Sequence, residues 1–568
     1  MRATGREFPA CQTIVEAGAS KSIARHGRLP LNAGGIMSVR PRPTDSLIVF
    51  EDDDLLVVNK PAGWNTHAPS SYAGEGVFDW LRHREPRWAN LAIIHRLDKD
   101  TSGILVFGKS TRANQSLTEQ FSRRSVQKRY WLLTDRSMEK DAMTATSTIE
   151  RAGSKYVSRP AHPGDTAETR FLVLSRRTGR MLVEATPVTG RTHQIRVHAA
   201  ENGIPILGDI LYGATPWRRL CLHAASLTLD HPGSGERITF DAPAAFEADI
   251  RQALRAAVID PEKSDSWRCL HGAADDWPGW YVDRIGPAAL SQAETSPSGA
   301  RLQYLQAMPG VSSIYHKHLN RQVRRAKAAE ASPERIAGES VPDPFTVREN
   351  GVRYELSFRE GYSVGLFLDQ RDNRRRLLTN HVGAQFPLFE GEASGRAVLN
   401  TFSYTCGFSV SAALAGARTT SLDLSKKYLE WGKRNFRLND LDPDKHEFLY
   451  GDALNWLGRL ARKERLFDAV LLDPPTFSQS KESGVFRVEK DYGKLVTAAL
   501  GVLRPAGVLF ASTNAAAVTP EEFVATVTQA VIEAGRTSLQ RLYVPQPPDF
   551  PISRTEPGYL KTLWLRVR

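Results

Sequence analysis

A single carboxylate, Asp98, is the first residue of this sequence whose setting favours chemistry. It lies in the polar segment Asp-Lys-Asp-Thr-Ser-Gly, which leads directly into an apolar, strand-like run at residues 104–107. A carboxylate on a loop that a buried strand fixes is held rigidly and can project into a cleft. Arg96, two residues earlier, can balance the charge of this carboxylate or bind a phosphate. The same residue types are common in ordinary turns, so the segment alone leaves both interpretations open.

Three more acidic residues, Asp423, Asp452 and Asp473, each follow an apolar, strand-like segment in the last third of the chain. In an open parallel sheet, such residues gather at the carboxyl edge, where ligands bind. Asp423, after the second strand-like segment of this third of the chain, suits the hydroxyl groups of a ribose, and Asp452 can accept the amino group of an adenine. The alternative is that Asp423 and Asp452 only cap helices, as Asp often does.

The elements that would position these acids differ between the two halves of the chain. Residues 46–258 contain short strands and turns, which predict a β-rich, mixed catalytic domain. Residues 361–568 alternate strand and helix patterns and end in a hairpin, which predicts a doubly wound, Rossmann-like, seven-stranded sheet. The proline-rich residues 259–360 between them are expected to form a small β-rich domain that binds RNA or substrate. The predicted fold class is therefore multidomain α+β and α/β.

The composition favours a polyanionic partner. Among 568 residues, 75 Lys and Arg face 63 Asp and Glu, which gives a net charge of +12 and a pI near 9.5. Four widely spaced cysteines without a CxxC pair exclude a cysteine-rich zinc module and favour a reducing compartment, and we predict no metal site. No run of about 18 apolar residues is present, so we expect a cytoplasmic protein without a membrane-spanning helix. Residues 1–45 are expected to be a flexible basic leader, with Met37 as an alternative start.

The segment HRLDKDTSG around Asp98 resembles the active-site signature of RNA pseudouridine synthases of the RluA type. Further segments match this family in the same order: EDDDLLVVNKPAGWNTH, QKRYWLL, TGRTHQIRVH, GDILYG and RLCLHAASLTLDHP. The family acts on ribosomal or transfer RNA, so the resemblance implies an isomerase that converts uridine to pseudouridine without a cofactor. The reaction breaks a glycosidic carbon–nitrogen bond, rotates the detached uracil and rejoins it through carbon.

The same resemblance implies roles for individual residues. Asp98 would be the central carboxylate, Arg191 would pair with it, and Tyr130 would stack on the base and assist proton removal. The basic run before Tyr130 is by itself more typical of a solvated surface. Beside this motif, we interpret it as a set of phosphate contacts. The residues expected to bind the RNA are Arg123, Arg124, Lys128 and His193, and Arg96 joins the catalytic set.

The last third resembles S-adenosylmethionine-dependent methyltransferases of large-subunit ribosomal RNA, especially the guanine-N7 type. The matching segments are GLFLDQRDNRR, NTFSYTCGFSVSAALAGA, LDLSKKYLEWGKRNFRLND and DPPTFSQSK. The loop after the first strand holds one glycine, Gly407, which disfavours a dinucleotide, because a pyrophosphate cradle needs several. The resemblance implies S-adenosylmethionine as the cofactor. Its expected contacts are Asn400, Phe402, Tyr404, Thr405, Gly407, Asp423, Asp452, Asp473, Asp369, Gln370 and Arg371.

The positions of the cysteines bear on which atom is methylated. Methylation at carbon 5 of cytosine needs a thiolate that first adds to the ring. Neither DPPTFSQSK nor FASTNAAA contains a cysteine, and Cys406, in the cofactor loop, is expected to pack as a small apolar residue. Nitrogen 7 of guanine has an in-plane lone pair, so positioning can suffice. We therefore expect a purine nitrogen, with guanine N7 favoured, Phe477 stacking on the base and Asp473 orienting it.

Two interpretations of the whole chain remain open. In the first, it is a bifunctional RNA-modifying enzyme whose substrate is expected to be large-subunit ribosomal RNA. In the second, only the synthase is active, and the methyltransferase-like half is an RNA-binding or ribosome-assembly module. The intact Asp-Pro-Pro loop and the cofactor acids favour the first. A small-molecule methyltransferase would leave the first half unexplained. The sequence defines neither the target nucleotides nor an oligomeric state.

Overall fold

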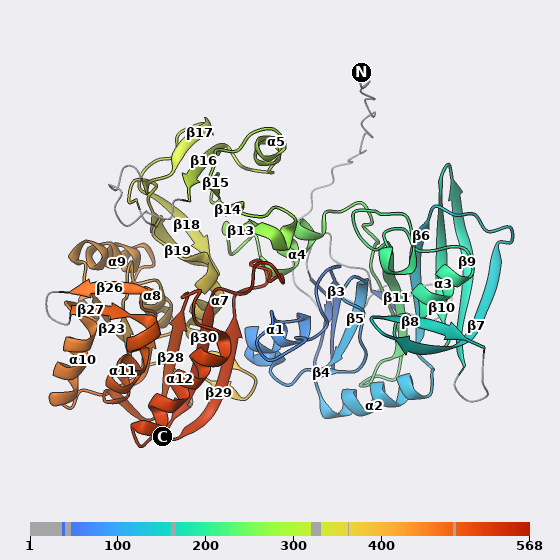
Figure 1. Ribbon diagram of the computed structural model, residues 1–568. Helices are drawn as coiled ribbons and strands as arrows, with labels where there is room; N and C mark the ends of the chain where they lie inside the picture. Colours follow the sequence, from blue (N-terminus) through green and yellow to red (C-terminus); the bar gives the residue numbers. More distant parts are fainter. Residues whose placement is uncertain (1–36, 40–46, 161–165, 320–330, 362, 481–483) are drawn as a thin grey trace, which may run out of the picture.

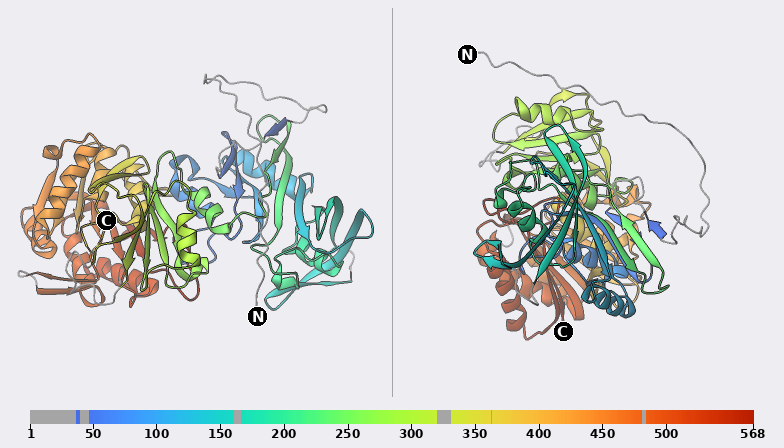
Figure 2. Two further views of the ribbon diagram at one scale, coloured as in Figure 1. Left: turned by 90° about the horizontal axis from the view of Figure 1, so that it is seen from above. Right: turned by 90° about the vertical axis from the view of Figure 1, so that its right-hand side faces the viewer.

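The computed structural model describes residues 37–39, 47–160, 166–319, 331–361, 363–480 and 484–568. These residues build three main β-sheets, which we call the first sheet, the middle sheet and the seven-stranded sheet (Figure 1). Seen from above, the first and the seven-stranded sheets lie toward opposite ends of the molecule (Figure 2). None of the described helices is long and apolar enough to cross a membrane.

The first sheet carries the Asp98 loop. Its main path runs through β2 (Ile48–Glu51), β3 (Leu55–Lys60), β5 (Ser102–Gly108), β11 (Leu222–Asp230), β6 (Gln127–Thr134), β10 (Arg180–Pro187), β9 (Ala167–Arg177), β7 (Ala142–Ala152) and β8 (Lys155–Arg159). Every residue of β5 is buried, because β3 and β11 pair with it on both edges. Gly103 has φ +117°, and a Cβ there would lie 2.3 Å from the carbonyl oxygen of Ala224. Glycine is therefore what lets β5 approach β11 this closely.

Three helices accompany the first sheet: α1 (Val77–Arg84), α2 (Thr111–Ser122) and α3 (Gln194–Glu201). A short strand, β4 (Ala92–Ile93), pairs with β5 just before the Asp98 loop. Most of the predicted leader lies outside the described residues. Its residues Met37–Val39 form β1, which pairs in parallel with β12 (Arg237–Asp241). This part of the predicted leader therefore belongs to the sheet rather than to a free segment.

The middle sheet lies between the other two in the chain. Its five strands, in spatial order, are β13 (Ser266–His271), β14 (Tyr281–Ile285), β15 (Ala288–Ala293), β16 (Ser313–His318) and β17 (Glu334–Gly338). The helix α5 (Ala300–Gln306) connects β15 to β16, and a separate hairpin follows, made of β18 (Phe345–Glu349) and β19 (Val352–Leu356). The helix α4 (Ile250–Val258) leads in from the first sheet, and its Arg255 forms a buried ion pair with Asp275, 2.7 Å apart.

The third sheet confirms the predicted seven-stranded, doubly wound fold. Its order is β24 (Glu447–Tyr450), β23 (Arg418–Asp423), β22 (Ala397–Thr401), β25 (Phe467–Leu472), β28 (Leu503–Thr513), β30 (Lys561–Val567) and β29 (Ser538–Pro545). The first five strands are parallel, and β30 is antiparallel to both neighbours. Its helices are α8 (Gly407–Leu414), α9 (Lys426–Leu438), α10 (Ala453–Arg462), α11 (Val488–Leu500) and α12 (Pro520–Glu533). Alternate residues of β25 explain its apolar sequence: Val470 packs with α11 and α12, whereas Leu471 packs with α8 on the other face.

A short, highly charged helix, α7 (Arg371–Leu378), joins the first half of the molecule to the second. It lies against α1 of the first half (Figure 1). The indole Nε1 of Trp80 in α1 donates to Asp372 at 3.3 Å, and Arg375 pairs with Glu85. Arg371 is almost fully buried and forms two hydrogen bonds, of 2.7 and 2.8 Å, to Asp549. Because buried charges need partners, this helix depends on contacts from both halves.

Candidate active sites

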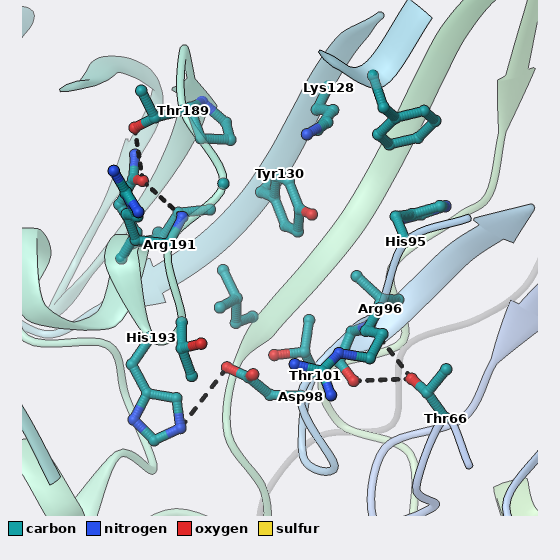
Figure 3. A pocket seen from close by; sticks show the side chains of 18 of the residues that line it. Thr66, His95, Arg96, Asp98, Thr101, Lys128, Tyr130, Thr189, Arg191 and His193 are labelled. Atoms are coloured by element: carbon teal, nitrogen blue, oxygen red, sulfur yellow. Dashed lines mark hydrogen bonds and ion pairs between the residues drawn. The ribbon is translucent and has the colours of Figure 1, made fainter. Parts of the chain in front are cut away.

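A cavity of about 820 Å³ opens beside Asp98. Strand β6, the loop before β5 and the segment that leads into α3 surround it (Figure 3). The structure brings most of the predicted synthase residues into its lining: Arg96, Asp98, Arg124, Lys128, Tyr130, Arg191 and His193. Arg123 is the exception, because it forms an exposed ion pair with Glu119, 2.6 Å away, at the end of α2. Arg123 therefore lies outside this lining, and its phosphate contact stays a prediction.

The Asp98 loop is held by two side chains, one at the end of β3 and one in the segment after it. Lys60 is fully buried, and its Nζ donates to three backbone carbonyls, including that of Lys99 at 3.0 Å. Burial lowers the pKa of Lys60 to about 7. The Thr66 hydroxyl donates to the Leu97 carbonyl at 2.8 Å and accepts from the Leu97 N–H at 3.2 Å. These hydrogen bonds hold the backbone on both sides of Asp98 and so fix the direction of its carboxylate.

Asp98 has two cationic neighbours that the sequence did not predict for it. Its carboxylate lies 3.8 Å from His193 Nε2 and 4.0 Å from Arg196 Nη1. Arg196 is held by two hydrogen bonds of 2.7 Å to Asp209. Burial lowers the pKa of His193, and the charge of Asp98 opposes that effect. Arg191, the predicted partner of Asp98, lines the same cavity on the side away from Arg96 (Figure 3). His193 and Arg196 therefore add to the surroundings of Asp98, and the pairing of Asp98 with Arg191 stays a prediction.

Tyr130 and Lys128 extend from β6 into the same cavity as Asp98 (Figure 3). Burial raises the pKa of Tyr130, and the charge of Asp98 adds to the effect. The phenol therefore stays protonated near neutral pH and can donate a hydrogen bond. Burial lowers the pKa of Lys128, whose ammonium lies 5.0 Å from the centre of the Phe121 ring. His95 stacks on Phe121, and burial followed by the charge of Lys128 lowers the pKa of His95 to about 3, so it is neutral.

At the seven-stranded sheet, the loop between β22 and α8 has an unusual backbone. Phe402, Tyr404 and Cys406 have φ values of +53°, +49° and +64°, and α8 begins directly afterwards at Gly407. Such left-handed residues turn successive N–H groups toward one side of a loop. The N–H of Tyr404 donates to the Asp423 carboxylate at 2.8 Å. We call residues 402–406 the cofactor loop.

Asp423 lies at the end of β23, and the structure holds its carboxylate firmly. Besides the Tyr404 N–H, it accepts the Ser425 N–H at 2.8 Å, and burial raises its pKa. The nearby Asn400 and Thr405 are almost fully buried. Asn400 Nδ2 donates to Ser409 at 2.9 Å, while its Oδ1 has no hydrogen-bond partner among the described residues. Thr405 donates to the Gly365 carbonyl at 2.6 Å, so its hydroxyl fixes the loop.

Asp473 follows β25, at the same edge of the sheet. Gln370 Nε2 donates to both of its carboxylate oxygens, at 3.2 Å each, and also to the Ser512 hydroxyl at 2.9 Å. Burial raises the pKa of Asp473 to about 6, and the nearby carboxylate of Asp369 contributes. A carboxyl group that titrates near neutral pH in such a position is typical of functional sites.

Three other predicted cofactor contacts have different surroundings. Asp452 is the N-cap of α10 and accepts the Asn455 N–H at 3.0 Å, as the capping alternative predicted. Arg371 is turned into the core toward Asp549, which corrects its prediction as a pocket-lining residue. Asp369 accepts the Tyr559 hydroxyl at 2.8 Å and lines a second cavity, beside the middle sheet.

The loop after Asp473 forms a small hairpin of β26 (Phe477–Ser480) and β27 (Gly484–Arg487). Phe477 lies at its start, and the Arg487 guanidinium is 5.9 Å from its ring centre. Cys406 is fully buried, and burial raises the pKa of its thiol to about 12. The structure therefore agrees with the prediction that this cysteine packs as a small apolar residue.

Two family models match the chain: RNA pseudouridylate synthase over residues 54–201 and S-adenosylmethionine-dependent methyltransferase over residues 292–566. A ribosomal RNA large subunit methyltransferase from Deinococcus radiodurans is 34% identical over 339 residues, which are 58% of this chain and 79% of that protein. A ribosomal large subunit pseudouridine synthase C from Yersinia pestis is 41% identical over 222 residues, 37% of this chain and 68% of that protein. The solved structure of a candidate S-adenosylmethionine-dependent methyltransferase from Streptococcus mutans is 27% identical, with a TM-score of 0.44, and covers 53% of this chain and 75% of that one.

Proposed function

We propose that both activities of this chain act on large-subunit ribosomal RNA. The premise is that the chain belongs to the RNA pseudouridylate synthase family and to the S-adenosylmethionine-dependent methyltransferase family. The chain is a bifunctional RNA-modifying enzyme, an isomerase joined to a methyltransferase. Relatives of both halves are named for the large ribosomal subunit, which supports a shared substrate. We assign the synthase to residues 46–258, RNA or substrate binding to 259–360 and methyl transfer to 361–568.

At the synthase site, we assign the central role to Asp98. The target uridine must first leave its helix or loop, which costs roughly a few kcal/mol that aromatic and cationic contacts offset. The Asp98 carboxylate then acts on the sugar or the base, with its orientation held by His193 and Arg196. Tyr130 offers a ring for stacking, and its hydroxyl assists the shift of one proton from carbon 5, which loses it, to nitrogen 1, which gains one. The cations expected to bind the neighbouring phosphates are Arg96, Arg124, Lys128 and Arg191.

The residues at the carboxyl edge of the seven-stranded sheet fit S-adenosylmethionine. Asp423 is fixed by two backbone N–H groups and still has lone pairs for the hydroxyls of a ribose. The buried, unpartnered Oδ1 of Asn400 suits a donor group of a ligand. When bound, this cofactor supplies an electrophilic methyl group on a sulfonium. The remaining work, which is to bind the base, orient it and exclude water, falls to the chain itself.

We favour guanine N7 as the methylated atom. Attack through carbon 5 of cytosine requires a thiolate, and the buried Cys406 has a thiol whose pKa is raised to about 12. Guanine N7 has a lone pair in the ring plane, so it needs orientation rather than covalent activation. We assign the stacking on the base to Phe477, at the start of β26, and its orientation to Asp473, which follows β25.

The main support for the proposed synthase activity is that most of the predicted residues line the same cavity beside Asp98. Mapping pseudouridines and methylated bases in ribosomal RNA from cells with and without this gene tests the whole proposal. We expect at least one pseudouridine and one N7-methylguanine to disappear from large-subunit RNA when the gene is absent. Loss of pseudouridine alone would favour the second function, a synthase whose methyltransferase-like half only binds RNA. Loss of 5-methylcytosine would overturn the assignment of the methylated atom.

A further inference from the structure

A second cavity, of about 460 Å³, lies between the middle sheet and the seven-stranded sheet. One wall is formed by strands of the middle sheet, which contribute Gln292 from β15 and Lys317 from β16. The opposite wall is formed by residues 363–369 and by Phe550 and Tyr559 from the segment between β29 and β30. We call this cavity the seam pocket. It is separate from the synthase cavity, with which it shares no lining residue.

The seam pocket adjoins the cofactor loop through Phe367. This side chain lines the pocket, is 41% exposed, and has its ring centre 5.4 Å from that of Tyr404 in the cofactor loop. A large aromatic side chain that stays exposed at such a position is free to stack on a ligand. One end of the seam pocket therefore lies next to the site proposed for the methyl donor.

The seam pocket also adjoins Asp473, through Asp369. Asp369 lines the pocket, and the residue that follows it, Gln370, donates to both carboxylate oxygens of Asp473. The two carboxylates are close enough for the charge of Asp369 to contribute to the raised pKa of Asp473. A group that contacts Asp369 in this pocket therefore lies close to the cofactor loop and to Asp473.

The lining suits a flat, polar ring. Ligand pockets commonly measure roughly 300–1,000 Å³ and combine aromatic walls with a few fixed polar groups. The seam pocket has aromatic rings from Phe367, Phe550 and Tyr559. Asp369 accepts one hydrogen bond, from Tyr559, and an ionised carboxylate has about four lone-pair sites in all. Two further lining residues, Arg268 and Asp283, form an ion pair 2.5 Å apart. Because their charges neutralise each other, this pair favours no net charge on the ring.

We propose that the seam pocket receives the flipped-out guanine nucleotide that the methyltransferase half modifies, so that the middle sheet forms one wall of the acceptor site. This inference rests on the proposed methyl transfer to RNA. Phe367, which lines the pocket, stacks on the base here in place of Phe477, which does not line it. Asp369 accepts the N–H groups of the Watson–Crick edge of the base. That contact leaves N7, on the opposite edge, directed away from Asp369. Adenine is disfavoured, because its ring nitrogen on the same edge is an acceptor and would face the carboxylate.

The test uses the full-length enzyme, transcribed large-subunit ribosomal RNA and two conservative variants. Asp369→Asn keeps the bond from Tyr559 but removes the charge, and Lys317→Gln changes the wall that the middle sheet provides. We expect Asp369→Asn to lower kcat/KM for methyl transfer by roughly 10–100-fold, as for the loss of a hydrogen bond to a charged group. Lys317→Gln should raise KM for the RNA with little change in kcat. Calorimetry should show unchanged S-adenosylmethionine affinity for both variants, and pseudouridine formation should continue at the wild-type rate.

The matched control is Gln303→Ala, an exposed position of α5 beside the same middle sheet but outside the pocket. It should leave every rate unchanged. Wild-type methyl transfer in both pocket variants would overturn the seam pocket as the acceptor site. A parallel loss of S-adenosylmethionine affinity would also overturn it, because these residues would then serve the cofactor. Failure of the proposed function is distinguishable, since the wild-type enzyme itself would then form pseudouridine but transfer no methyl group.

Discussion

The two active sites of this enzyme are assembled in different ways. The synthase cavity is built by one sheet and its loops, with Asp98 before β5 and Tyr130 on β6. The methyltransferase edge combines distant segments: Asp473 after β25 is held by Gln370, whose neighbour Asp369 contacts the segment before β30. A site within one packed unit can therefore be disabled alone. A site assembled at a seam also depends on how the neighbouring units pack.

The largest expected effect is at the synthase site. Asp98→Asn preserves the shape of the side chain but removes its charge, so pseudouridine formation should fall below roughly one per cent of the wild-type rate. Methyl transfer should continue, because the sites have separate cavities. Both products can be measured on the same transcribed RNA. Residual pseudouridine formation of more than a few per cent would remove Asp98 from the central role.

The corresponding change at the methyltransferase site is Asp423→Ala. It removes a fixed carboxylate at the proposed ribose position and should weaken S-adenosylmethionine binding by about 1–3 kcal/mol. Calorimetry measures this loss directly. Pseudouridine formation is the internal control and should be unaffected. Unchanged affinity would place the cofactor away from β23.

The rates of the two activities should also differ in how they depend on pH. Because the pKa of Asp473 is raised to about 6, this group is ionised at neutral pH and becomes protonated as the pH falls through that value. If its carboxylate orients the base, methyl transfer should be half-maximal near pH 6 and fall about tenfold per unit below it. Asp473→Asn should abolish this midpoint. A methyl-transfer rate that stays constant down to about pH 5 would argue against an ionised Asp473 in the reaction.

A smaller effect is expected at the junction between the halves. Trp80→Phe keeps most of the buried ring but removes the hydrogen bond to Asp372 of α7. The free energy of unfolding should fall by about 1–3 kcal/mol. Because α7 directly follows Gln370, methyl transfer should decrease more than pseudouridine formation does. Trp88→Phe is a matched control, since Trp88 is similarly buried and donates to Glu51 within the first half. Equal decreases in both activities for Trp80→Phe would show that the junction is only structural.

The smallest effect should come from Cys406→Ala. This thiol is fully buried and protonated at neutral pH, so it has no chemical role in the proposed reaction. We expect most methyl transfer to remain, with a modest fall in melting temperature from the lost packing. An inactive but folded variant, verified by its unchanged circular dichroism, would instead point to a thiolate mechanism and to a pyrimidine product.

The sequence predicted the parts of each site that local pattern controls. The apolar run after Asp98 indicated a buried strand, and the alternation of strands and helices in residues 361–568 indicated the doubly wound sheet. In both cases, hydrophobic periodicity alone decides which face of an element is buried. The convergence of cavity residues around Asp98 followed from the resemblance of their motifs to one family.

Other features depend on packing that no local pattern encodes. Lys60 at the end of a strand looks like an exposed charge, and only the tertiary structure brings three carbonyls to its ammonium group. Arg196 lies in the same motif as Arg191, and only the geometry of α3 brings its guanidinium to 4.0 Å from the carboxylate of Asp98. Arg371 belongs to a strongly basic segment, yet its partner Asp549 is distant in sequence. Long-range pairing of this kind can be seen only in the folded chain.

The most direct test of two independent active sites in one chain is a single reaction in which both products are counted. Wild-type enzyme, Asp98→Asn and Asp423→Ala are each incubated with transcribed large-subunit ribosomal RNA and S-adenosylmethionine, and both modified nucleosides are quantified by mass spectrometry. Our account predicts both products for the wild type, only the methylated base for Asp98→Asn, and only pseudouridine for Asp423→Ala. Loss of both products in either variant, with the protein still folded, would contradict it.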